Sequence, residues 1–383
     1  MKKNYFWLLS VIGACAIFSS TMSKNPVLPL FADFLGASKE YIGVISAAST
    51  IPGILISMPA GILSDIYGRK RMLYIALFVF ASAPFLYLVV TELWQLAVIR
   101  FYHGVATAIF GPVALAAVAE RYSGDRAARL GLFSSTTMVG RMMAPAIGGF
   151  LLTFGSFSSV YIACAAGGLI AFILGTFLED TPSQASQTAH KDYRAVLANK
   201  RIMITTSVEA CQYFTFGGFE TFLPLYAVSV GIAPSYIGII FTIQLIVTML
   251  TKPAMGKLSD SIGRAPSISM GVVLGAISLL VIPYGHHWWT LAGAVSVYGL
   301  GLATVTASTS ALVSDLSQGA YGSALGVLSM IMDVGQASGP IVTGILITVL
   351  SYRAAFTCLA CVLMGVGLFF FIVVGRKGQR EER

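Results

Sequence analysis

The peptide GILSDIYGR at residues 61–69 returns as GKLSDSIGR at residues 256–264. The two copies lie 195 positions apart, and the same offset aligns residues 28–69 with 223–264 at 17 of 42 positions without a gap. Self-similarity at a fixed offset marks one structural unit that occurs twice. The fold is therefore predicted to consist of two similar halves.

The composition predicts that both halves lie in a membrane. The chain has 383 residues, of which 56% are hydrophobic and 10% charged, and its mean hydropathy is +0.82. Soluble domains carry roughly 25% charged residues, so this chain cannot cover a water-facing surface. Its apolar runs have the length of bilayer-spanning helices, and the alternating segments of a membrane β-barrel are absent. Twelve spans are predicted, at about 6–32, 40–63, 72–90, 94–119, 129–153, 157–178, 200–230, 235–258, 266–284, 288–314, 323–350 and 352–375.

The spans predict an all-α polytopic membrane protein with two parallel six-helix bundles. One repeat of 195 residues holds six spans, an even number, so both halves have the same orientation. We expect bundles at residues 1–178 and 200–383, the second with a short cytoplasmic tail, joined by a polar cytoplasmic linker at 179–199. The chain contains no GxxxxGK[ST] phosphate loop. An ATP-driven pump in one polypeptide and a sizeable soluble enzyme are both excluded.

The placement of Lys and Arg predicts the topology. With both termini in the cytoplasm, the inner loops and termini hold 18 of these residues, whereas the outer loops hold two, Lys39 and Arg353. This asymmetry follows the positive-inside rule for a multi-pass protein of the cytoplasmic membrane. It also accounts for the net charge of +8, so nucleic acid is not a predicted partner. Four more basic residues fall inside spans: Lys24, Arg100, Arg141 and Lys252.

Cysteine and histidine usage predicts neither disulfides nor a metal site. All five cysteines fall within spans, and Cys358 and Cys361 have no His or carboxylate beside them to complete a metal-binding set. The pair His286–His287 precedes two tryptophans that suit the membrane interface. No metal and no cofactor is expected.

The repeated loop resembles a motif of the major facilitator superfamily. GILSDIYGRKR at 61–71 matches the family pattern G-x-x-x-D-x-x-G-[RK]-[RK] between helices 2 and 3. We expect Gly61 to permit close helix approach, Gly68 to reverse the turn, and the basic run to lie at the cytoplasmic headgroups. The resemblance implies that Asp65 contacts the start of helix 11 and latches the cytoplasmic side. The latch residues are Gly61, Asp65, Gly68, Arg69, Lys70 and Arg71, with Gly256, Asp260, Gly263 and Arg264 in the second copy.

Three further motifs resemble those of the twelve-helix drug:proton antiporters of that superfamily. GRMMAPAIGG at 140–149 is similar to the antiporter motif G-x-x-x-G-P-x-x-G-G of helix 5, with Ala144 in place of the second glycine. Arg100 with Gly104 resembles the R-x-x-x-G motif of helix 4, which is associated with proton transfer, and KNPVLPLF at 24–31 resembles the helix 1 signature. The antiporter motif assigns packing roles to Gly140, Pro145, Gly148 and Gly149.

Ionisable residues inside spans are the candidates for coupling chemistry, because a charge at mid-membrane costs about 2.5–3.5 kcal/mol. Glu209 and Glu220 are eleven residues apart, so they share one face if helix 7 is continuous through Gly217-Gly218. Asp333 and Arg141 lie near the middle of helices 11 and 5, and Arg141 can pair with Asp333 or Glu209. The proton-coupling candidates are Glu220, Asp333, Glu209 and Arg100, and the cavity candidates are Arg141, Gln212, Phe216, Asn25, His103 and Gln336.

Together these features predict a secondary active transporter, a proton-coupled exporter of small and drug-like molecules that works by alternating access. An importer or facilitator of a sugar-like metabolite on the same fold stays open as the alternative, and a sensor or scramblase is disfavoured because no regulatory domain is present. The expected partners are a small-molecule substrate, protons and the bilayer, and the expected oligomeric state is a monomer.

Overall fold

A computed structural model describes the chain except residues 1, 123, 180–192, 318–320 and 376–383. The described residues form α-helices, two short 3-10 or π turns and no strand. Eleven helical stretches are long and apolar enough to cross a membrane. The twelfth predicted span is α10 (Lys200–Ser229), a continuous helix of 30 residues that carries two glutamates. The predicted fold class of twelve membrane helices is therefore confirmed.

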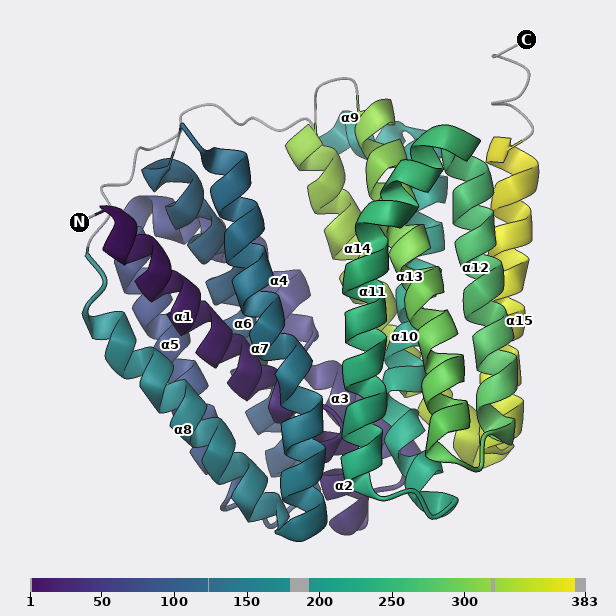
Figure 1. Cartoon of the computed structure of the whole chain (residues 1–383), viewed down its shortest axis with the longest axis horizontal. Helices are drawn as coiled ribbons and strands as arrows, with labels where there is room; N and C mark the ends of the chain where they lie inside the picture. Colours follow the sequence, from purple (N-terminus) through teal and green to yellow (C-terminus); the bar gives the residue numbers. More distant parts are fainter. Residues whose placement is uncertain (1, 123, 180–192, 318–320, 376–383) are drawn as a thin grey trace. The chain divides into compact units, whose positions relative to one another are not determined.

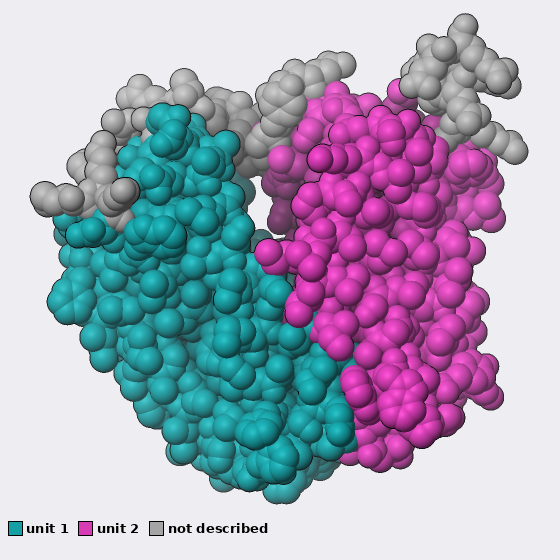
Figure 2. Space-filling view, viewed as in Figure 1, with its two compact units in different colours: residues 1–37, 44–189, 233–242 teal, residues 38–43, 190–232, 243–383 magenta. Residues whose placement is uncertain are grey.

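Unit 1 comprises residues 1–37, 44–189 and 233–242 (Figure 2, teal). Within it α1 packs against α7 and α8, α5 packs against α6 and α8, and α4 packs against α6 (Figure 1). The packing buries a continuous apolar core that contains Phe6, Phe80 and Phe110. Its helices are α1 (Lys2–Met22), α2 (Val27–Phe34), α3 (Lys39–Ala48, from residue 44), α4 (Ile51–Tyr67), α5 (Arg69–Tyr87), α6 (Leu93–Arg121), α7 (Arg126–Phe154) and α8 (Phe157–Thr176).

Unit 2 comprises residues 38–43, 190–232 and 243–383 (Figure 2, magenta). Here α10 packs most extensively against α14, and α12 packs against α13 and α15. Much of the predicted linker, residues 180–192, and the tail 376–383 lie outside the described residues. The helices of the unit are α9 (Tyr193–Ala198), α10, α11 (Pro234–Ile262, from residue 243), α12 (Arg264–Val281), α13 (Trp288–Leu316), α14 (Tyr321–Val349) and α15 (Tyr352–Phe370).

The repeat offset of the sequence fixes the helix boundaries as well. α5 begins at Arg69 and α12 at Arg264, α6 begins at Leu93 and α13 at Trp288, and the later helices keep the same spacing. The halves differ in their first two helices. The first span is interrupted between α1 and α2, and the second span is interrupted between α3 and α4 at Ser49-Thr50. Their counterparts in the second repeat, α10 and α11, are continuous.

Candidate functional site

A buried arginine joins three helices at the repeated loop of unit 1. Arg69 forms an ion pair with Asp65 of α4 and a two-pronged pair with Glu120 of α6, where Nη2 lies 2.6 Å and Nε 3.2 Å from the carboxylate oxygens. It also donates a hydrogen bond to Ser64. Gly68 precedes it with φ +92°, a left-handed conformation that glycine adopts without strain. The loop motif is thus a three-helix clamp.

Unit 2 contains the same clamp at the repeated positions. Arg264 forms ion pairs with Asp260 and, through Nε at 3.2 Å, with Asp315 of α13, and it lies 3.4 Å from Ser259 Oγ. Gly263 has φ +96°. The second clamp is more exposed, since 25% of the Arg264 side chain is accessible against 6% for Arg69. Exposed ion pairs contribute less to stability than buried ones.

The clamp confirms part of the expected role of the motif and corrects part of it. Gly68 does form the reversing turn. A methyl group on Gly61 would meet no described atom within 4 Å, so a close helix approach at this glycine stays a prediction. The Gly61 carbonyl instead accepts a hydrogen bond from Ser64. Arg69 does not lie at the headgroups, because two carboxylates hold it in the protein; Lys70 and Arg71 remain available for that role. The contact of Asp65 with the start of the eleventh span, α14, would join the two units and stays a prediction.

The antiporter motif on α7 brings two other helices close in unit 1. A methyl group on Gly140 would overlap the Ala14 carbonyl of α1, and one on Gly148 would lie 3.0 Å from Met22. A methyl group on Gly149 would overlap the carbonyl of Pro234 in the first turn of α11. The contact is reciprocal, because Gly238 of α11 meets the Pro145 carbonyl in the same way. Ala144, where the pattern has glycine, is fully buried, so the small side chain keeps the packing.

The corresponding stretch of α14 makes the same contacts in unit 2. Gly335 and Gly339 meet the carbonyls of Ala210 and Phe214 on α10. Further along the helix, Gly344 meets the Lys39 carbonyl in the first turn of α3. Gly43 of α3 in turn meets the carbonyl of Pro340. Three of the contacts, those of Gly140, Gly149 and Gly238, therefore recur in the second repeat at Gly335, Gly344 and Gly43.

Arg100 is a second buried arginine of unit 1. Its Nη1 donates to the Tyr87 hydroxyl at 3.3 Å, and its Nη2 donates to Ser49 at 2.8 Å, at the interruption of helix 2. His103 Nδ1 lies 3.5 Å from the same Tyr87 hydroxyl. Arg100 is 3% exposed and has no carboxylate partner among the described residues. The guanidinium is therefore held by hydroxyl groups inside the bundle.

Gly104, one turn after Arg100 on α6, allows this helix to approach the interruption at Ser49-Thr50 closely. A methyl group on Gly104 would overlap the Ser49 carbonyl. The arginine of the R-x-x-x-G motif thus binds the Ser49 hydroxyl, while the glycine makes room for the Ser49 backbone. Ser49 and Tyr87 were not predicted as site residues, because hydroxyls inside apolar spans carry no sequence signal of their own.

Glu209 is one of two buried acids on α10 of unit 2. It lies on α10, is 4% exposed and accepts a hydrogen bond from Thr309 of α13. The charge of Lys252 on α11 acts on the same carboxyl group. The acid therefore links α10 to α13 within one bundle. Thr309 was not predicted, although its repeat partner is the apolar Ala114 and the contrast marks it.

A polar and aromatic stripe continues along α10 from Glu209. The Tyr298 hydroxyl donates to the Gln212 carbonyl at 3.0 Å and lies 2.8 Å from Thr215 Oγ1. The Phe216 ring stacks near Tyr298, with centroids 6.1 Å apart. The Gln212 side chain is fully buried, and its amide has no hydrogen-bond partner within the described ranges. Continuity of α10 through Gly217-Gly218 confirms that Glu209 and Glu220 belong to one helix.

The remaining candidates lie in both units. Glu220 is 9% exposed on α10, and Asn25 is 6% exposed at the interruption of helix 1. Asp333 is half-buried on α14, and Gln336 lies one turn further, its carbonyl beside Gly217 of α10. Arg141 is an exposed residue of α7. Its pairing with Asp333 or Glu209 would join the two units and stays a prediction.

This fold, with a buried base in one bundle and buried acids in the other, is that of a polytopic membrane transporter rather than an enzyme. The Major Facilitator Superfamily profile matches residues 9–231 and 205–383, and the chain belongs to this family. The chain is similar to the quinolone resistance protein NorA of Staphylococcus aureus, at 24% identity over 93% of the chain and 94% of the relative. Multidrug resistance protein 2 of Bacillus subtilis is 25% identical over 84% of the chain and 83% of its own length.

A solved structure shares the fold. The nucleoside transporter NupG superposes with a TM-score of 0.81 over 96% of this chain and 98% of its own, at 18% identity. At that identity the likeness concerns the fold alone.

Proposed function

We propose that this protein is a proton-coupled exporter of small lipophilic molecules. The observation that carries the proposal is the buried acid Glu209 of α10, with Glu220 eleven residues further along the same helix. The repeat partners of these acids are Ala14 and Asn25, so the bundle fold does not require carboxylates at these positions. A carboxyl group that exchanges a proton in only some conformations couples proton entry to substrate exit.

The character of the α10 stripe and the relatives support a drug-like substrate. Phe216 and Tyr298 supply aromatic surface close to the unpartnered Gln212 amide, and apolar walls with few polar groups are typical of small-molecule sites. Two relatives that match most of the chain are named for quinolone and multidrug resistance. Export by antiport is the activity that agrees with both.

We also propose a membrane location, a topology and an oligomeric state. We place it in the cytoplasmic membrane as a monomer with both termini in the cytoplasm, following the distribution of Lys and Arg. Residues 1–178 and 200–383 act as the two transport bundles, joined by the linker 179–199. Protons supply the driving force: one charge moved across 100 mV provides about 2.3 kcal/mol.

The test is transport into inverted membrane vesicles with and without an imposed pH gradient, using a panel of cationic dyes and neutral metabolites. Glu220→Gln keeps the size of the side chain but cannot release a proton, so it should retain substrate binding and lose concentrative uptake. Glu209→Gln should give a milder defect. Asp125→Asn is the matched control, because Asp125 is exposed and its side chain makes no capping hydrogen bond.

Two results would decide against the proposal. Near wild-type accumulation by Glu220→Gln would remove this acid from the mechanism and make Asp333 the principal candidate. Flux that ignores the pH gradient and runs in both directions would identify a facilitator, the alternative that the fold also supports.

A further inference from the structure

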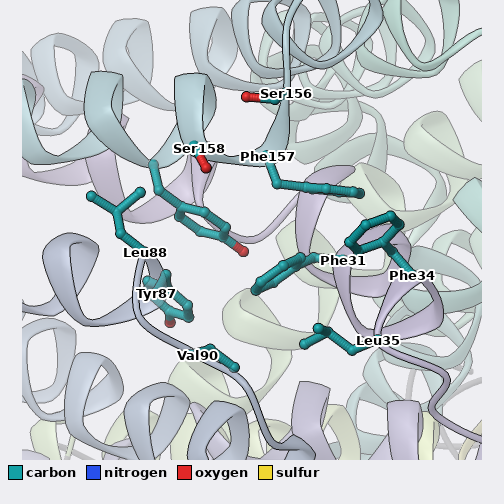
Figure 3. Close-up of a pocket in the computed structure, with 10 residues that line it drawn as sticks. Phe31, Phe34, Leu35, Tyr87, Leu88, Val90, Ser156, Phe157 and Ser158 are labelled. Carbon is teal, nitrogen blue, oxygen red and sulfur yellow. The ribbon is translucent and has the colours of Figure 1, made fainter.

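Unit 1 contains a pocket that the transport mechanism does not use. It has a volume of about 290 Å³ and lies where α2 ends, α5 ends and α8 begins. Figure 3 shows the rings of Phe31, Phe34 and Phe157 on one side of it, and Tyr87 and Leu88 on the other. The aromatic walls contact one another, with Phe31 and Phe157 centroids 5.0 Å apart.

The inner wall of the pocket carries an unpartnered polar group. Tyr161 lines the pocket, is 1% exposed, and its hydroxyl has no hydrogen-bond partner among the described residues. It stacks on Tyr87 with centroids 4.5 Å apart, and Tyr87 accepts the hydrogen bond from buried Arg100. A buried hydroxyl without a partner is costly, and a bound ligand that accepts its hydrogen bond would offset that cost.

Two further features make this pocket attractive to an anion. Phe157 and Ser158 line it and belong to the first turn of α8, and their N–H groups have no carbonyl partner within the helix. The next two N–H groups, of Ser159 and Val160, already donate to Ser156. A helix N-terminus favours negative charge. The guanidinium of Arg100, which no carboxylate neutralises in the described structure, lies behind Tyr87 and adds positive potential.

An apolar groove continues from the pocket. A second cavity of about 260 Å³ shares Val90 with the first and runs between the end of α5 and the start of α6. Trp94 lines it and is 59% exposed, as expected for a tryptophan at a membrane interface. The polar end and the apolar groove together match an amphiphile with an anionic head and a hydrocarbon chain. The other residues that line the groove are Leu86, Val89, Gln95, Val98 and Ile99.

The equivalent region of the second repeat satisfies its own polar groups. Phe356 occupies the position of Tyr161 and has no hydroxyl. Tyr226 occupies the position of Phe31, and its hydroxyl donates to the Gly285 carbonyl. Arg353 stacks over the Tyr284 ring at 4.1 Å. The bundle fold therefore works without an unpartnered hydroxyl here, and the hydroxyl of Tyr161 is a specific addition to the first repeat.

We propose that this pocket binds one phospholipid of the leaflet opposite the chain termini. The phosphate accepts hydrogen bonds from Tyr161 and from the first turn of α8, and one acyl chain lies in the groove beside Val90 and Trp94. The phosphate of a phospholipid supplies the acceptor that the site lacks, and the bilayer supplies the lipid at this depth. The site lies outside the stripe of α10 and does not depend on the direction or coupling of transport.

The test is native mass spectrometry of the purified full-length protein with equal amounts of dioleoylphosphatidylglycerol and dioleoylglycerol. Wild type should retain one phosphatidylglycerol at collision energies that strip other lipids, with at least tenfold less dioleoylglycerol. Tyr161→Phe should lower this occupancy about three- to tenfold while keeping the fold, since the repeat carries Phe at the same position. Val90→Trp fills the groove and should abolish retention.

Val273→Trp is the matched control, because Val273 is an exposed apolar residue of α12 in unit 2. It should behave as wild type. Equal retention of both lipids by wild type would overturn the phosphate contact, and so would unchanged retention by Tyr161→Phe. Wild-type retention by Val90→Trp, or an equal loss in Val273→Trp, would show that the lipid belongs to the general annulus and would overturn the site.

Discussion

The two arginine clamps provide a quantitative test of how burial sets the strength of an ion pair. We compare Glu120→Gln in unit 1 with Asp315→Asn in unit 2, two changes that remove one negative charge from equivalent positions of the repeat. Both replacements are isosteric, and both leave the arginine its other carboxylate, Asp65 or Asp260. The comparison therefore measures how burial and hydrogen-bond geometry together set the cost of losing one contact.

The structure predicts unequal losses. The Arg69 and Glu120 side chains are 6% and 22% exposed, and the carboxylate accepts two hydrogen bonds from the guanidinium. Loss of a charged hydrogen bond in this setting costs about 1.5–3 kcal/mol. Arg264 and Asp315 are 25% and 58% exposed, so solvent screening reduces that loss to about 0.2–1 kcal/mol. For units of this size the melting temperature should fall by about 3–12 °C for Glu120→Gln and by less than about 4 °C for Asp315→Asn.

The assay is thermal unfolding of the detergent-solubilised variants. Unfolding is monitored by the labelling of the buried Cys164 and Cys211 with a thiol-reactive dye. A double-mutant cycle with Arg69→Gln completes the measurement, because coupled residues lose less together than the sum of their separate losses. Equal shifts for Glu120→Gln and Asp315→Asn would refute the role of burial. Additive losses in the cycle would refute the pair itself.

Two further predictions concern the helix contacts. Gly149→Ala should lower the melting temperature by several degrees, because the added methyl group overlaps a backbone carbonyl of α11. Gly61→Ala should change the melting temperature by less than about 1 °C, since the space around Gly61 is open. Equal shifts would contradict the packing argument. Thr309→Val should reduce pH-gradient-driven uptake at least about fivefold, because the hydrogen bond to Glu209 is lost. Thr309→Ser keeps the hydroxyl and should have uptake close to that of wild type. Equal uptake by the two variants would exclude the hydroxyl from coupling.

Most of the fold was predictable because the bilayer imposes simple requirements on the sequence. Apolar runs of fixed length specify the helices, and the offset of 195 between GILSDIYGR and GKLSDSIGR specifies how the two halves correspond. The interruption of helix 2 at Ser49-Thr50 was not predicted. Apolar residues flank this interruption on both sides, so hydropathy continues through it while the backbone does not.

The site was predicted less completely, because charge is visible in a sequence and its partners are not. Arg100 and Glu209 stood out as ionisable residues inside spans, which are costly unless they are paired. Their partners Ser49 and Thr309 are hydroxyls, which occur throughout membrane helices and bond to their own backbone. Only the three-dimensional packing selects one of them. The same limit applies to Gly61, since a motif glycine does not state which neighbour it faces.

Two buried ionisable residues, Arg100 and Glu209, depart from the repeat. Arg100 aligns with Val295, and Glu209 aligns with Ala14, so each half has replaced a small or apolar residue by a buried charge that its twin does without. Each charge has a hydroxyl partner from a neighbouring helix of its own bundle, Ser49 for the base and Thr309 for the acid. A hydroxyl can donate to a carboxylate and accept from a guanidinium, but it neutralises neither charge. The two bundles of one design therefore differ at these positions, with a basic group buried in the first and an acidic group buried in the second.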